Sequence, residues 1–265
     1  MLRTLSSLAL IALTAASAPA AVLYSSIPKP LSPNLPSLGY QATSTAEFGG
    51  LIQFAGSAGS YSALRATVVM SDWAVASHYD SNLAGFSQLL TLTIYNVGPG
   101  DTVGAPIASD TVDAFIPWRP EASAGCGTAW LAADGACYNG MAFEVKFDFE
   151  NVTVPGQVIY GLAFDTQSYG ANPTGTQGPY NSLNFDLSET GPRVGSDPLP
   201  GTAYWNTSHD AFYTDGGANG VGTFRQDTNW PYSGAIEFDT PEPSTLTLLG
   251  AGLIGLAFFL RRVRR

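Results

Sequence analysis

The sequence predicts an all-β fold, an antiparallel β-sandwich of jelly-roll-like type, with a single hydrophobic helix at the C-terminus. Short segments that alternate apolar and polar residues, separated by glycine and proline, are typical of strands and turns. Only 12% of the 265 residues are charged, and there are 29 glycines. Between the two ends of the chain no helical stripe exceeds two turns. An immunoglobulin-like sandwich is the alternative, but the Cys–Trp–Cys spacing that would indicate it is lacking.

The strongest strand pattern lies at residues 143–150. Four apolar residues alternate there with Glu144, Lys146, Asp148 and Glu150. This period of two predicts a strand with one buried face and one wet face. Residues 117–139 and 169–222 are expected to be largely loops. Further strands are predicted at residues 64–70, 90–94, 157–164, 182–187 and 234–238.

The N-terminus has the parts of a secretory signal peptide. Arg3 gives a short positive region, and residues 5–16 are apolar. Ala18-Pro19-Ala20 then supplies small residues at the two positions that signal peptidase reads, so we expect cleavage after Ala20. The alternatives are cleavage after Ala18 and an uncleaved anchor, for which the apolar region is short.

The C-terminus carries a second topogenic signal. Pro241, Glu242, Pro243 and Ser244 precede an apolar run that ends at residue 260. The charge-free residues 244–260 would span about 25 Å as a helix, at the short end for a bilayer core. Basic residues after such a helix stay on the cytoplasmic side. The basic tail consists of Arg261, Arg262, Arg264 and Arg265.

This order of a Pro-Glu-Pro-Ser motif, one hydrophobic helix and a basic tail resembles the PEP-CTERM sorting signal of Gram-negative bacteria. Thr240 stands where many members have valine, a small departure. The resemblance implies recognition by an exosortase, a membrane-embedded cysteine transpeptidase, with removal of the tail. It also implies an exported protein, often associated with extracellular polysaccharide.

These signals predict four segments. Residues 1–20 are the signal peptide, residues 21–45 a proline-rich lead, residues 46–240 the β-sandwich domain and residues 241–265 the sorting signal. The lead carries Pro28, Pro30, Pro33 and Pro36. Because proline favours extended backbone, we expect this segment to be extended and poorly packed.

Charge limits the partners of the exported part. Residues 21–240 hold six basic and 20 acidic side chains, a net charge of −14 against −10 for the whole chain. A strongly acidic body argues against nucleic acid and other polyanions. It suits a soluble surface protein.

Cys126 and Cys137 are the two cysteines of the chain. In an oxidising compartment a pair this close in sequence is expected to form a disulfide. The bridge would contribute about 3 kcal/mol in the chain-entropy description. A metal pair or a catalytic cysteine is the alternative.

No motif for hydrolysis stands out. Ser208-His209-Asp210 is not a triad, because adjacent side chains of a strand point to opposite faces. Glu144 and Glu150 would lie about 20 Å apart along one strand, too far for a glycosidase pair. His78 is expected to lie at a turn or on the surface.

Two kinds of ligand site remain as candidates. Asp210, Asp215 and Asp227 lie in a glycine- and asparagine-rich region and could offer oxygen ligands to Ca²⁺, although aspartate is equally common in turns. Trp118 and Trp205 could stack on sugar rings if they were exposed. The competing interpretation is that the tryptophans fill the core.

The leading hypothesis is therefore a non-enzymatic, exported protein of the cell envelope or the exopolysaccharide matrix. The alternatives are a carbohydrate-binding module and a secreted glycoside hydrolase. Expected partners are exosortase, signal peptidase and the export machinery, the membrane before processing, and extracellular polysaccharide. Apart from Ca²⁺ no cofactor is expected. The chain should pass through an intermediate tethered to the inner membrane.

Overall fold

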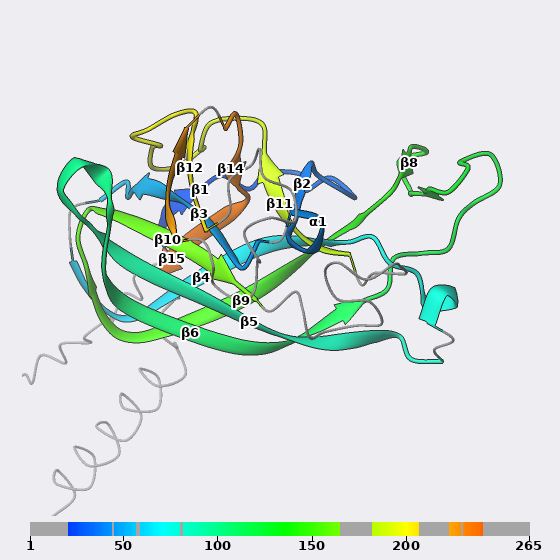
Figure 1. Ribbon diagram of the computed structural model, residues 1–265, viewed down its shortest axis with the longest axis horizontal. Helices are drawn as coiled ribbons and strands as arrows, with labels where there is room; N and C mark the ends of the chain where they lie inside the picture. Colours follow the sequence, from blue (N-terminus) through cyan, green and yellow to red (C-terminus); the bar gives the residue numbers. More distant parts are fainter. Residues whose placement is uncertain are drawn as a thin grey trace, which may run out of the picture. The chain divides into compact units, whose positions relative to one another are not determined.

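The computed structural model describes residues 21–43, 45–56, 59–79, 82–164, 182–206, 223–228 and 230–240 (Figure 1). Residues 22–240 form one compact unit, and residues 1–21 and 241–265 belong to a second. The described part is all-β, as predicted, and its helices are single turns. These are α1 (Tyr40–Thr43), η1 (Ala76–Tyr79) and η2 (Pro99–Asp101).

The larger sheet has seven strands, and every pairing for which the register is known is antiparallel. The long strands β4 (Gly59–Asp72) and β9 (Met141–Val154) pair along their whole length. The order is β1 (Ala21–Ser25), β15 (Ile236–Thr240), β4 (Gly59–Asp72), β11 (Leu183–Ser188) and β14 (Ser233–Gly234), with β2 (Ser37–Gly39) on β11 and β9 (Met141–Val154) on β4.

The second sheet has six strands and is also antiparallel. Its longest strand, β6 (Val103–Pro117), lies in a stretch for which the sequence pattern predicted no strand. A separate two-stranded ribbon joins β7 (Trp130–Leu131) and β8 (Cys137–Tyr138). The order of the second sheet is β13 (Arg225–Thr228), β12 (Thr202–Trp205), β3 (Glu47–Gln53), β10 (Gln157–Ala163), β5 (Gly85–Val97) and β6 (Val103–Pro117).

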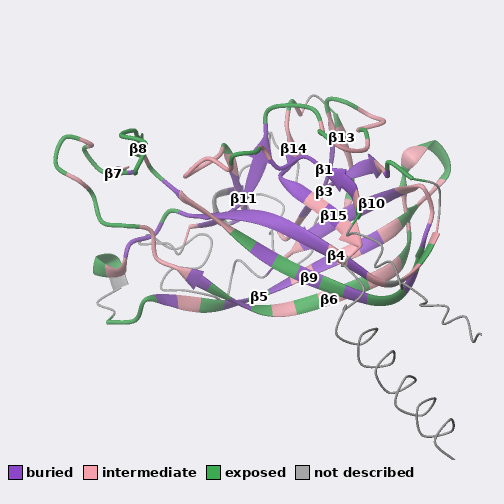
Figure 2. Cartoon of the chain, turned by 180° about the vertical axis from the view of Figure 1, so that it is seen from behind, coloured by how far each residue is buried: buried purple, intermediate pink, exposed green. Residues whose placement is uncertain are grey.

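One core cluster takes side chains from both sheets. Leu64 and Phe147 come from the larger sheet, and Leu92 and Tyr160 from the second, and all four are fully buried. Along β9 the predicted alternation is confirmed, since the four charged side chains are exposed between buried apolar ones (Figure 2). The predicted strands at 64–70, 90–94, 157–164, 182–187 and 234–238 correspond to β4, β5, β10, β11 and β14–β15.

The prediction of a poorly packed lead at residues 21–45 is wrong. Tyr24 and Tyr40 are fully buried, and Ile27 packs on Val69 and Ala235 on the outer face of the larger sheet. The Tyr40 hydroxyl donates to the Leu162 carbonyl at 2.6 Å. The prolines keep this segment extended, as expected, but its apolar residues alternate with them and reach the sheet. An extended strap and a linker have the same proline pattern, and only contacts distinguish them.

The described part of the chain holds no helix that is both long and apolar enough to cross a membrane. The predicted signal peptide and the predicted helix at residues 244–260 lie outside the described residues.

Candidate functional site

A polar hollow of about 230 Å³ lies on the outer face of the larger sheet, over β15, β4 and β9. Antiparallel register brings its side chains into rows across the three strands. Thr67 of β4 faces Glu237 on one side and Lys146 on the other. Two residues earlier on β4, and therefore on the same face of the sheet, Arg65 lies opposite both Asp239 and Asp148. The hollow is lined by Ile27, Lys29, Arg65, Thr67, Glu144, Lys146, Glu237 and Asp239.

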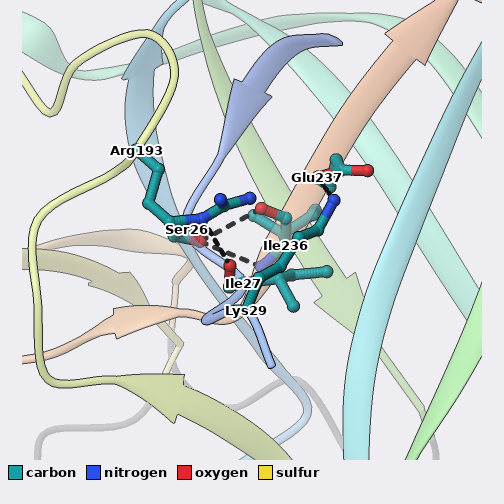
Figure 3. Close-up of polar contacts among 6 residues, drawn as sticks. All are labelled: Ser26, Ile27, Lys29, Arg193, Ile236 and Glu237. Atoms are coloured by element: carbon teal, nitrogen blue, oxygen red, sulfur yellow. Dashed lines mark hydrogen bonds and ion pairs between the residues drawn. The ribbon is translucent and has the colours of Figure 1, made fainter. Parts of the chain in front are cut away.

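The proline-rich segment contributes one wall of the hollow. The Ser26 hydroxyl donates to the Ile236 carbonyl at 3.1 Å and accepts from the Ile236 amide at 3.0 Å, and Arg193 Nε donates to the Ile27 carbonyl (Figure 3). The Ser26 bonds fix the segment to β15, and the Arg193 bond ties it to the loop that follows β11. Lys29 can then reach Glu237, at 3.4 Å between Nζ and Oε2.

The charges of the hollow are balanced and only partly paired with each other. Arg65 Nε lies 3.4 Å from Asp148 Oδ1, beside the hollow. Burial raises the pKa of the Asp239 carboxyl, and the nearby Arg65 opposes this shift. Within the described residues Thr67, Glu144, Lys146 and Asp239 form no side-chain hydrogen bond or ion pair. Glu144 and Lys146 are exposed and Asp239 is half-buried, so their polar atoms can meet a ligand, whereas Thr67 lines the hollow with only 7% of its surface exposed.

A second groove, of about 470 Å³, begins on the other side of Glu144 and Lys146. It lies between the edge strands β9 and β6, which pair with β4 and β5 respectively and not with each other. Beyond the groove, a hydrogen bond joins the two edge strands: the Asp148 amide of β9 donates to the Asp110 carboxylate of β6 at 2.8 Å. The groove is lined by Val112, Asp113, Ala114, Phe115, Glu144, Val145 and Lys146, of which Phe115 is 59% exposed.

The predicted disulfide between Cys126 and Cys137 is confirmed, with the two Cα atoms 5.6 Å apart. It braces the β7–β8 ribbon, which lies at one end of the body (Figure 1). At the base of this loop the Arg119 guanidinium donates to the carbonyls of Trp73 and Thr128, at 2.8 and 3.0 Å. As predicted, residues 117–139 are otherwise loop.

Of the two interpretations of Trp205, the structure contradicts the exposed stacking residue and confirms the tryptophan that fills the core. Its side chain is 1% exposed and packs edge-on against Phe48 and Trp230, with ring centroids 5.5 and 5.0 Å apart. The short strand β12 turns this residue toward the core, where a large apolar ring is most stable. Trp118 is half-buried and lies against Phe86, so its proposed role in stacking stays a prediction.

The candidate calcium ligands are not brought together by the described structure. Asp210 and Asp215, like His209, lie outside the described residues. Asp227 is on β13, opposite Ala203. In the ranges that the structure describes, no three His, Cys, Asp or Glu side chains are placed to hold a metal ion. His78 is exposed in η1, in agreement with the expectation of a surface position.

Two buried carboxyl groups were not predicted from the sequence. Asp186 of β11 is fully buried, neither of its side-chain oxygens has a hydrogen-bond partner among the described residues, and burial raises its pKa to about 9. Asp72 of β4 is also buried, and its pKa is raised to about 8 although it accepts the Ala74 amide. The one signal in the sequence is that an apolar residue directly follows each aspartate and another stands at most two residues before it.

The comparisons with known proteins concern the C-terminus. The family described as the PEP-CTERM protein-sorting motif matches residues 239–265, so the resemblance of the C-terminal signal is confirmed. The match begins within β15, two residues before Pro241. No curated protein and no solved structure matches the chain.

Proposed function

We propose that this chain, which carries a PEP-CTERM sorting motif, acts without catalysis in the cell envelope or an exopolysaccharide matrix. The motif at residues 239–265 carries the proposal, because it marks a protein that is exported and sorted through its C-terminus. The Cys126–Cys137 disulfide supports it, since such bonds persist in oxidising compartments. Exosortase is the partner that the motif implies, with removal of the tail. Signal peptidase would first cleave after Ala20.

The finer fold belongs to the same proposal. We infer a jelly-roll-like β-sandwich, in which the two sheets face each other across the shared core. The support is that both sheets are antiparallel and contribute to one cluster of buried side chains. In such an arrangement the outer faces of the sheets remain for ligands or partners.

The sorting role can be tested in the native host. Replacing Pro241, Glu242 and Pro243 by alanine should leave the protein in the membrane and reduce its release or surface display. Glu189→Ala with Pro200→Ala changes the same residue types at exposed positions of the body and is the matched control. Localisation is followed by fractionation and surface labelling. Unchanged display of the motif variant would contradict the assignment.

Carbohydrate binding is the second candidate function. The observation that favours it is the polar hollow, whose lining includes four polar side chains that have no hydrogen-bond or ion-pair partner among the described residues. Concave sites with a few convergent polar groups are the usual form of small-molecule sites.

A glycoside hydrolase is the third candidate function. If the protein were such an enzyme, incubation with oligosaccharides should release reducing ends. We expect no release from a non-catalytic body.

A further inference from the structure

The hollow and the groove are adjacent, because Glu144 and Lys146 line both of them, and the two spaces together are called the path below. On one side of these two residues the path lies over β4 and β15, and on the other side it reaches β6. The two spaces measure about 230 and 470 Å³, so together they fall within the range of small-molecule sites. A ligand built as a chain of linked units would fill both spaces, whereas a single small ion would fill neither.

The balance of charge in the hollow points to an uncharged, hydroxyl-rich ligand. Lys29, Arg65 and Lys146 face the carboxylates of Glu144, Glu237 and Asp239, which gives the lining a net charge of zero. A sugar hydroxyl both donates and accepts, so it can bond an ammonium group and a carboxylate at once. Hydrogen bonds to charged partners are the stronger ones. A polyanion would instead meet three carboxylates here and a strongly acidic body.

Phe115 provides an independent indication. This large apolar side chain is 59% exposed and lines the groove together with Lys146. An aromatic face beside polar groups suits a sugar ring, which presents apolar C–H groups on its faces and hydroxyls at its rim. An amino acid or another small zwitterion would use the charges of the hollow but not this ring.

We propose that the path binds a neutral oligosaccharide. One sugar unit lies in the hollow with its hydroxyls bonded to Thr67, Glu144, Lys146 and Asp239. A following unit lies in the groove against Phe115. This inference rests on the second candidate function and gives it a site and a ligand class. It moves the site away from the tryptophans and onto β4, β9 and β6.

The test uses the full chain, purified in a detergent without a sugar headgroup because glycosidic detergents would compete. The probes are a panel of neutral hexose oligosaccharides, a matched panel of uronic-acid oligosaccharides and a matched amino-sugar panel. We expect the neutral panel to bind. Thr67→Val, Lys146→Ala and Phe115→Ser should each weaken that binding at least tenfold.

Glu150→Gln is the matched control, because Glu150 is exposed on the same strand β9 and lines neither space. It should bind the neutral panel within twofold of the wild type. Hydrogen exchange of the unmodified protein gives a readout that does not depend on any variant. Bound oligosaccharide should slow exchange of the amides of residues 112–115 and 144–146.

Three outcomes would overturn the proposal. They are silence of the neutral panel, tighter binding of the uronic-acid or amino-sugar panel, and path variants that bind as the wild type does. Surface display of the same variants is measured in parallel. If the protein and its path variants were displayed normally but bound no sugar, the site would be refuted and the sorting proposal would stand. Loss of display in the variant of residues 241–243 concerns the sorting proposal alone.

Discussion

Replacing Asp186 by asparagine should stabilise the protein at neutral pH and much less in mild acid. The carboxyl group is fully buried on β11, its oxygens have no partner in the part of the chain that the structure describes, and burial raises its pKa from 3.8 to about 9. Asparagine has nearly the same shape and cannot ionise. The substitution therefore removes the proton linkage and preserves the packing.

The sign follows from the order of the two pKa values. Between pH 3.8 and about 9 the unfolded chain loses the proton of Asp186 while the folded protein keeps it. The unfolded state then binds fewer protons, so stability falls as pH rises through this window. Each pKa unit corresponds to about 1.4 kcal/mol, so the loss reaches at most about 4 kcal/mol at pH 7 and about 0.6 kcal/mol at pH 4.

The assay is urea denaturation of the wild type and the Asp186→Asn variant from pH 4 to pH 8, with the disulfide intact. Tryptophan fluorescence reports unfolding, because Trp205 is buried in the folded state. The asparagine amide adds a cost of its own in the buried site, but that cost does not depend on pH. The advantage of the variant over the wild type should therefore grow by about 3 to 4 kcal/mol between pH 4 and pH 7.

Asp148→Asn is the control, since its side chain is 72% exposed and its ion pair with Arg65 lies at the surface. Such pairs contribute about 0 to 1 kcal/mol, so this variant should show little change across the same pH range. If the advantage of Asp186→Asn were the same at pH 4 and pH 7, the carboxyl would not be held protonated by burial. The reasoning from its missing partners would then be refuted.

Two further outcomes test the core and the loop. Trp205→Ala should lower the free energy of unfolding by about 3 to 5 kcal/mol, because it empties a packed site between Phe48 and Trp230. Leu131→Ala, at a position that is 52% exposed, should change it by less than about 0.5 kcal/mol in the same denaturation experiment. Replacing Cys126 and Cys137 by serine should cost about 3 kcal/mol. It should also speed hydrogen exchange in the β7–β8 ribbon, and unchanged exchange there would argue against the bracing role of the bridge.

The parts of the fold that the sequence predicted correctly depend on local patterns. The alternation of Val145, Lys146 and Phe147 along β9 has the period of a strand, and that period is visible without knowledge of the partner strand. Cys126 and Cys137 are close enough in sequence to predict their bridge from compartment and spacing alone. The errors came where one local pattern fits two environments. Proline-rich segments occur both in linkers and in packed straps, and the tryptophan of a short strand can face either way.

The sorting signal could be recognised without any knowledge of the fold. Such signals are linear motifs, in which a short polar motif, an apolar segment and a basic tail follow one another along the chain. The candidate site, the polar hollow, could not be predicted from local patterns, because it forms only when distant strands pair. Thr67, Lys146 and Glu237 are far apart in the chain, and they meet because β15 and β9 pair with β4 on opposite sides in a particular register. The burial of Asp186 and Trp205 has the same origin. Register and layering depend on contacts between distant strands, and a pattern of period two assigns a residue to a face without showing what covers that face.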